Sequence, residues 1–447
     1  MPAFRRPLFA AVAAAMRSGK VQILAGPRQT GKTTILKQLA ADLLSQGVAP
    51  ARILYLPLDD FEDELSKGEM SLRAIIETFS EEIARTPLAS GEKFVFLDEA
   101  HVHPGWAREA KILHDQDLPV RLVVSGSAAT DLLAAAATHL AGRSVEHVAL
   151  PLAFGELLLA RLEGADLHAA REAGARMSDA VVTALEGDTE TLSKVRDRAL
   201  KGLAGLGPRL RADLSAYLRR GGFPEQALKG MSDQDADSRL HGVLDQMIRR
   251  DFVNFFHVRD TKTLERLIRI LAQNTGRILS ERRLASDVGA AINTVRNHVG
   301  FLERTFVVFP VRALQASAAA QARLPEKFYF LDPGLRNSLA GYGHDDRGQL
   351  LESVVHSHLM ALLRSRRPAA AIHYWRRGGD EVDLVAAEGP RLLGIEVHSS
   401  GTGLRGLRRF LDDNRGASGV LVSDAAPSAP APGIVWIPPQ VLLLAQA

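Results

Sequence analysis

The sequence of 447 residues contains no cysteine. This absence excludes disulfide bonds, zinc sites and iron–sulfur clusters with cysteine ligands, and catalytic thiols. The sequence also lacks a long apolar run of the kind that crosses a bilayer, and no internal repeat or long low-complexity tract is visible. These absences favour a globular protein of a reducing compartment, and we expect a cytoplasmic protein with no membrane partner.

Length and charge set further bounds. A length prior of about 150 residues per domain predicts two or three domains. The net charge of +3 is small for this length, so it permits nucleic-acid binding without arguing for it. The segment 1–20 carries two arginines ahead of an Ala-rich run, but cleavage within that run would leave almost nothing before the next strand. We therefore expect an amphipathic helix with Leu8, Val12 and Met16 on one face, rather than a signal peptide.

The first third of the chain alternates strand-like and helical patterns. Apolar runs typical of strands occupy residues 21–26, 51–60, 93–101 and 120–128, and helical patterns separate them. This alternation predicts a parallel sheet covered on both faces by helices, which is an α/β fold.

The first strand-like run ends in the turn GPRQTGKTT, which fits the P-loop pattern G-x-x-x-x-G-K-[ST] between a strand and a helix. Glycines let the backbone N–H groups approach phosphate oxygens, and the following helix adds the positive end of its dipole. We expect Lys32 to bridge the β- and γ-phosphates of ATP and the Thr33 hydroxyl to coordinate Mg²⁺. The residues expected to bind the nucleotide are Gly26, Pro27, Arg28, Gln29, Thr30, Gly31, Lys32, Thr33 and Thr34.

A pair of acidic residues follows the strand-like run FVFL. Parallel sheets place ligands at the carboxyl ends of their strands, so Asp98 and Glu99 should converge with the P-loop. Asp98 is expected to hold Mg²⁺, and Glu99 to orient and polarise the attacking water. A second acidic residue predicts ATP hydrolysis rather than mere binding.

Two further groups are candidates for catalysis. The run VRLVVSGSA ends in Ser125 and Ser127, either of which would act as a polar sensor of the γ-phosphate, with an ordinary Ser-rich turn as the alternative. Arg143 would supply positive charge to the γ-phosphate, in its own or a neighbouring subunit, with an exposed surface arginine as the alternative. The expected catalytic set is Glu99, Lys32, Ser127 and Arg143.

Six segments, in this order, are similar to those of prokaryotic AAA-type P-loop ATPases that carry a C-terminal domain of unknown function. They are GPRQTGKTT, FLDEAH, VVSGSA, AGR, LPLAFGE and YLRRGGFPE. The resemblance spans nearly the whole chain and implies an AAA+ core, a winged-helix middle and a C-terminal domain similar to PD-(D/E)XK nucleases. The motif DEAH also occurs in helicases, but those need a second RecA-like core that this sequence does not show.

The predicted organisation has four parts. An ATPase core spans residues 1–155, a helical lid or connector 156–260, a winged-helix domain 261–312, and an α/β nuclease-like domain 313–447. Ser280 is expected to cap the second helix of the winged-helix domain. The third helix is expected to expose Asn293, Thr294, Arg296, Asn297 and Arg304, a set suited to DNA, although many winged helices contact only protein.

The C-terminal part offers a second candidate site. Glu352, Asp383 and Glu396 follow the nuclease order and would hold a divalent cation for phosphodiester hydrolysis. His398 stands where the nuclease pattern has lysine, and a histidine is mostly neutral at physiological pH. The alternative is a nuclease-like fold kept for packing or recognition.

Three functions agree with these patterns. The first is a Mg²⁺-dependent ATPase, as a homo-oligomer, whose nucleotide state moves the winged-helix and nuclease-like modules. The second is a slow ATP switch that binds DNA or a protein partner. The third is an ATP-gated, metal-dependent DNA nuclease, on which the histidine at position 398 casts doubt.

Overall fold

The computed structural model divides into two compact units, Met1–Leu150 and Pro151–Ala447. It describes residues 2–61, 64, 71–127, 129–249, 253, 260–315, 321, 324–399, 401, 403–429 and 431–445. The first division of the chain thus falls within five residues of the predicted end of the ATPase core at residue 155. Everything after it forms one unit, where the sequence predicted three parts.

The first unit is built on a parallel sheet. Its elements are α1 (Pro7–Ala15), β1 (Val21–Ala25), α2 (Lys32–Ser45), β2 (Ile53–Pro57), α4 (Leu72–Thr78), β3 (Lys93–Asp98), α5 (Trp106–Asp115), β4 (Val120–Gly126), α6 (Ala129–His139) and β5 (Ser144–Val148). Among the described residues, five strands lie in the order β2-β3-β4-β1-β5, and every neighbouring pair is parallel. The α/β prediction is confirmed, and β5 is a strand that the sequence patterns did not reveal.

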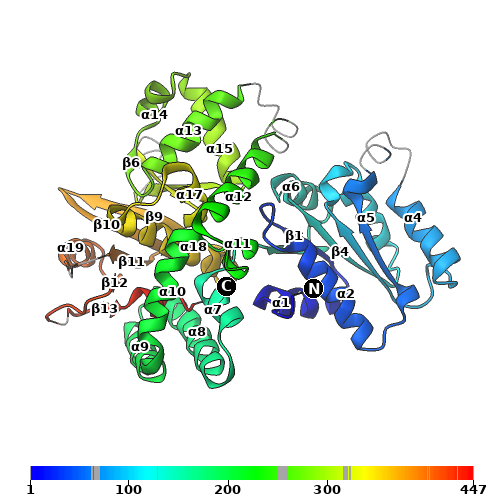
Figure 1. The fold of residues 1–447 in the computed structure, drawn as a ribbon, viewed down its shortest axis with the longest axis horizontal. Coiled ribbons are helices and arrows are strands. Elements are labelled where there is room, and N and C mark those ends of the chain that lie inside the picture. Colours follow the sequence, from blue (N-terminus) through cyan, green and yellow to red (C-terminus); the bar gives the residue numbers. More distant parts are fainter. Residues whose placement is uncertain are drawn as a thin grey trace. The chain divides into compact units, whose positions relative to one another are not determined.

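Burial explains why these runs form strands and helices. All six residues of β3 are buried, as expected for a parallel strand covered on both faces. Helices α1 and α2 pack against the sheet through a cluster that includes Val12, Leu36 and Phe96 (Figure 1). The predicted apolar face of the first helix is confirmed, because Val12 and Met16 are buried and Leu8 packs against the same cluster.

The second unit opens with a run of helices. Its helices are α7 (Phe154–Arg161), α8 (Gly164–Leu185), α9 (Thr189–Gly202), α10 (Gly207–Arg220), α11 (Pro224–Leu228), α12 (Asp233–Gln246), α13 (Thr261–Gln273), α14 (Glu281–Val288), α15 (Ile292–Arg304), α17 (Pro333–Ala340), α18 (Arg347–Arg366), α19 (Arg405–Asp413) and α20 (Pro439–Leu442). Helices α8 and α9 lie side by side (Figure 1). None of the described helices is both long and apolar enough to span a bilayer.

A mixed sheet organises the rest of the second unit. Its strands are β6 (Ile278–Leu279), β7 (Val308–Ala313), β8 (Glu326–Phe330), β9 (Ala371–Arg377), β10 (Asp380–Glu388), β11 (Arg391–His398), β12 (Ser418–Ser423) and β13 (Ile434–Ile437). The described strands run in the order β13-β12-β11-β10-β9-β7-β8-β6. Helices α8 and α18 contact β11 from the face of Ile395, whereas α19 packs near Gly394 on the opposite face.

The sheet crosses the predicted boundary between residues 312 and 313. Strand β7 pairs with β9 in parallel through Arg312 with His373 and Ala313 with Tyr374, and it pairs with β8 on its other side. The segment 261–312 therefore shares its sheet with the segment that follows it.

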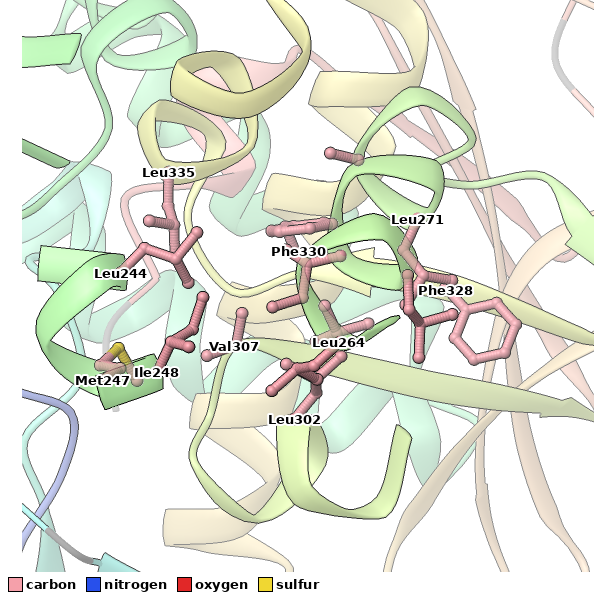
Figure 2. Close-up of a cluster of buried hydrophobic side chains, with 14 of the residues drawn as sticks. Leu244, Met247, Ile248, Leu264, Leu271, Leu302, Val307, Phe328, Phe330 and Leu335 are labelled. Atoms are coloured by element: carbon pink, nitrogen blue, oxygen red, sulfur yellow. The ribbon is translucent and has the colours of Figure 1, made fainter. Parts of the chain in front are cut away.

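The hydrophobic core around residues 261–312 is also shared. Figure 2 shows Leu264 and Leu271 of α13 packed with Leu302 of α15 and with Phe328 and Phe330 of β8. Residues of two flanking helices belong to the same cluster: Leu244 of α12 and Leu335 of α17. Ser280 caps α14 as predicted, since its hydroxyl accepts a hydrogen bond from the Arg283 amide.

This shared core predicts the effect of truncating Leu264, whose exposed fraction is 0%. Leu264→Ala should lower the free energy of unfolding of the second unit by about 2–5 kcal/mol, because it removes buried methyl groups and leaves a cavity. Leu228→Ala, at a leucine that is 38% exposed in the same unit, should change it by no more than about 0.5 kcal/mol. Urea unfolding followed by circular dichroism measures both. Equal losses in the two variants would contradict the assignment of this core.

Candidate functional site

The strand order of the first unit brings three strand ends to one edge. Strand β4 lies between β1 and β3, and all three are parallel. The P-loop follows β1, Asp98 ends β3, and Ser127 follows β4. Their carboxyl ends therefore meet at the edge where open α/β sheets bind ligands.

The P-loop backbone wraps closely at two glycines. A Cβ atom at Gly26 would lie 2.2 Å from the carbonyl oxygen of Ala149, so only glycine fits there. Gly31, just before the first residue of α2, has a φ of 92°, a left-handed conformation that favours glycine. Helix α2 therefore begins at the strand edge, where the free N–H groups of its first turn and the positive end of its dipole lie.

Lys32 lies folded into this loop. Its Nζ donates hydrogen bonds to the carbonyl oxygens of Gly26 at 3.0 Å and Pro27 at 2.8 Å, and the residue is only 4% exposed. The Thr30 hydroxyl donates to the same Pro27 oxygen at 2.9 Å. The ammonium is thus held over the loop that the sequence assigns to phosphate.

The remaining residues of the loop differ in burial. Thr33 and Thr34 lie half-buried in the first turn of α2, and Arg28 is half-buried. Gln29 is exposed, with a φ of 61°. Arg6, which sequence reasoning missed, fixes the loop from outside, because its Nη1 donates to the carbonyl oxygens of Thr30 at 2.9 Å and Leu150 at 2.8 Å.

Asp98 is held by hydroxyl groups from both neighbouring strands. The Tyr55 hydroxyl of β2 donates to its Oδ2 at 2.7 Å, and the Ser125 hydroxyl of β4 donates to its Oδ1. Burial and the hydrogen bond to Asp98 raise the pKa of Tyr55, so the phenol remains a donor. Of the two serines, Ser125 therefore positions Asp98.

Glu99 is fixed by partners on the neighbouring segments. Its Oε2 accepts a hydrogen bond from the Ser127 amide at 2.8 Å and lies 3.1 Å from Nδ1 of His101. Its backbone has a φ of 54°, which is strained for a glutamate. Burial alone would raise its pKa, but the hydrogen bond from His101, the charge of Lys32 and the Ser127 amide lower it below the usual range. Glu99 is therefore an ionised carboxylate at neutral pH.

The structure separates the other two predicted catalytic residues. The Ser127 hydroxyl is buried and has no hydrogen-bond partner among the described residues, so it is available to donate a hydrogen bond to a ligand at this edge. Arg143 precedes β5 at the amino end of the sheet, where its Nε donates to Asp115 at 2.6 Å and its carbonyl oxygen accepts from the Val21 amide. A five-residue strand of about 16 Å separates it from the P-loop of its own unit.

In the described part of the chain, no group of three histidine or acidic side chains is arranged to hold a metal ion. The hydroxyl and carboxylate oxygens at the P-loop edge nevertheless suit Mg²⁺, which usually keeps water and phosphate ligands beside one or two carboxylates. Thr33 and Asp98 are the residues at this edge that fit such an ion.

The second candidate site gathers around a lysine that sequence reasoning missed. Lys327 of β8 places its Nζ 2.9 Å from Glu352 Oε1 of α18, and 2.7 Å from Glu381 Oε1 and 3.2 Å from Asp383 Oδ1 of β10. The Tyr329 hydroxyl also donates to Glu352 Oε1. Glu352 and Asp383 therefore do converge, but on an ammonium group of the same chain.

Glu396 and His398 complete this region. Burial, and then the negative charge of Asp383, raise the pKa of Glu396 to about 9, so that it is protonated at neutral pH. The His398 Nε2 lies 3.8 Å from Glu396 Oε1 and forms a hydrogen bond with the carbonyl oxygen of Gly403 at 3.2 Å. We call Glu352, Glu381, Asp383 and Glu396 the carboxylate cluster.

Three family models match successive parts of the chain. Residues 18–158 match the model described as AAA domain. The matched residues include the P-loop, Asp98 and Glu99. Residues 211–346 and 347–438 match two models that are each described as a domain of unknown function, DUF8612 and DUF4143.

Whole-chain relatives are distant. An uncharacterized protein of Haemophilus influenzae is 22% identical over 84% of this chain and 82% of its own length. An uncharacterized protein of Mycobacterium tuberculosis is 25% identical over 89% of this chain and 74% of its own length.

Two solved structures align with TM-scores of 0.25. They are C. elegans PCH-2, with 13% identity over 65% of this chain and 67% of that chain, and the Bacillus subtilis DNA clamp loader delta protein, with 10% identity over 66% of this chain and 88% of that chain. The assignment of the AAA-type domain rests on the family model and on the strand order.

The environment of Glu99 predicts how its contribution to stability depends on pH. Since its pKa is lower in the folded than in the unfolded chain, the stabilisation is fully present above the ordinary glutamate value of 4.5 and is lost as the pH falls below it. Glu99→Gln should therefore be less stable than the wild type near neutral pH, and the difference in free energy of unfolding should shrink on acidification. Denaturation curves across this pH range measure it, and a difference that grows towards acid pH would contradict the assignment.

Proposed function

We propose that this protein is a Mg²⁺-dependent ATPase whose site lies at the P-loop edge of the first unit. The observation that carries the proposal is the ionised Glu99 carboxylate, held at the strand edge where the P-loop presents Lys32. A site that only binds a nucleotide needs no such base, whereas hydrolysis needs a group that orients water.

Each residue at the P-loop edge has a separate role in the proposed reaction. The N–H groups of the P-loop and Lys32 bind the phosphates, and Thr33 and Asp98 hold Mg²⁺, which neutralises charge on the phosphoryl group. Tyr55 and Ser125 keep the Asp98 carboxylate in place. Glu99 orients the attacking water, and the Ser127 hydroxyl donates to a phosphate oxygen or to that water.

The bonds of Lys32 support a binding role. Its ammonium donates to two neutral carbonyl oxygens, which are weaker acceptors than charged phosphate oxygens. Exchange of these acceptors for a phosphate is favourable, and the backbone of the loop need not be rebuilt for it.

Three variants test the ATPase proposal. Lys32→Ala should abolish ATP binding. Glu99→Gln should still bind ATP, but its rate of hydrolysis should fall by a factor of about 100 or more, because only the water-orienting group is lost. Lys20→Ala removes the same charge before β1, at the other edge of the sheet, and should leave turnover unchanged. Nucleotide binding and phosphate release are measured on the full chain. Wild-type turnover that persists in Lys32→Ala would refute the proposal.

A second observation favours binding to DNA by residues 261–312. This segment carries nine Lys and Arg against four Asp and Glu, a net charge of +5, whereas the whole chain carries +3. Its elements α13, β6, α14, α15 and β7 follow the order of a winged-helix domain, and β8, which lies beyond the segment, pairs with β7 in antiparallel fashion.

The surface of α15 supports this role. Asn293, Arg296, Asn297 and Arg304 are exposed, and Thr294 is half-exposed, in agreement with the sequence prediction. The Arg296 guanidinium is bound to Glu281 in a two-pronged ion pair, which would have to open for phosphate contact. We infer that ATP turnover is coupled to the placement of this basic surface on DNA, and a protein partner is the alternative.

Charge removal tests the DNA proposal. The double variant Arg282→Ala and Arg296→Ala should bind double-stranded DNA more weakly, with a salt dependence reduced by about 2 in log–log slope. The double variant Arg171→Ala and Arg198→Ala removes the same charge from exposed positions on α8 and α9 and should bind normally. Fluorescence anisotropy at several salt concentrations measures the slopes. Equal slopes for both doubles would exclude this surface and favour a protein partner.

A further inference from the structure

Lys327 is a buried charge at the centre of the carboxylate cluster. The residue is 1% exposed, and its Nζ has three carboxylate oxygens as partners, at 2.7, 2.9 and 3.2 Å. Two of these oxygens belong to Glu352 and Asp383, which the nuclease resemblance assigns to a divalent cation.

Further donors of the chain bind the same two carboxylates. Glu352 Oε1 accepts from both Lys327 and the Tyr329 hydroxyl, which fills both of its lone pairs. Asp383 Oδ1 accepts a hydrogen bond from Lys327 Nζ, and Asp383 Oδ2 accepts one from the Val397 amide at 2.9 Å. Each of these three oxygens therefore accepts at least one donor of the chain, and for two of them that donor is the charged Lys327 ammonium.

We propose that the Lys327 ammonium is the built-in cation of the carboxylate cluster, in the position that a nuclease of this fold would give to a divalent metal ion. The cluster is then closed to metal ions and serves to join β8 to α18 and β10. The sequence expectation of a metal-dependent nuclease site at Glu352, Asp383, Glu396 and His398 does not fit the residues present.

Geometry and charge both oppose a metal ion at the position of Nζ. A Mg²⁺ ion binds carboxylate oxygens at about 2.1 Å, so an ion on the oxygens that surround Nζ would touch the ammonium. Two positive charges at such a separation in a buried site repel each other strongly.

Protonation agrees with this arrangement. Burial alone would lower the pKa of Lys327, but the surrounding acidic groups raise it well above its usual range. The ammonium therefore compensates part of the negative charge of the cluster.

The ion pairs connect two segments that the family models keep apart. Lys327 belongs to residues 211–346, whereas Glu352, Glu381 and Asp383 belong to residues 347–438. Loss of the ammonium would leave carboxylates buried without a counter-charge, which a divalent cation could then supply.

The experiment measures Mn²⁺ binding to the full chain without nucleotide, by electron paramagnetic resonance. The wild type and Lys327→Arg should bind no Mn²⁺ that depends on Asp383. Lys327→Met, which keeps the length of the side chain but not its charge, should gain about one Mn²⁺ ion per chain. The double variant Lys327→Met and Asp383→Asn should lose that ion, while any Mn²⁺ at the P-loop edge is common to all variants.

Two outcomes would overturn the proposal. One is Mn²⁺ binding by the wild type that Asp383→Asn abolishes, since metal and ammonium would then share the site. The other is a folded Lys327→Met that gains no ion. If Lys327→Met does not fold, the wild type and its Asp383→Asn variant decide alone: equal Mn²⁺ binding in the two supports the proposal, and a loss in the variant refutes it.

Discussion

The position of β4 between β1 and β3 is the constraint on which the nucleotide site depends. Because the three strands are parallel and adjacent, the P-loop, the acidic pair and the Ser125–Ser127 turn all emerge at one edge. The central strand supplies a hydroxyl to Asp98 and an amide to Glu99. Each acidic side chain is thereby oriented by the strand that separates it from the P-loop.

The two units use a buried lysine in opposite ways. Lys32 donates to the neutral carbonyl oxygens of Gly26 and Pro27, which are acceptors that a phosphate can replace. Lys327 donates to three carboxylates, and separation of those charges in a buried site is costly. The first arrangement suits a group that binds and releases a ligand, and the second suits a permanent joint.

The meeting of the candidate site residues at one sheet edge could be predicted from the sequence, because they lie in short motifs whose order along the chain fixes their place at a strand end. Lys32, Asp98 and Glu99 are cases of this kind. The partners of these residues were harder to find, since Tyr55 lies one strand away and its role depends on strand order. His101 lies within the motif DEAH, so its place beside Glu99 could have been predicted from the sequence, but the sequence analysis assigned it no role.

The second unit was less predictable for a related reason. The strand at Glu326–Phe330 is short, and the lysine within it reads as a surface residue until the sheet brings α18 and β10 around it. The pairing of β7 with β9 joins segments about 60 residues apart, and local patterns carry no information about such contacts. For the same reason, Arg143 could not be placed at the far edge before β5 was known.

A structure of Glu99→Gln crystallised with ATP and Mn²⁺ tests the account most directly, because anomalous scattering locates every bound Mn²⁺ ion. The account predicts ATP on the P-loop with Mn²⁺ beside Thr33 and Asp98, and no Mn²⁺ in the carboxylate cluster around Lys327. A nucleotide bound elsewhere, or Mn²⁺ between Glu352 and Asp383, would contradict it.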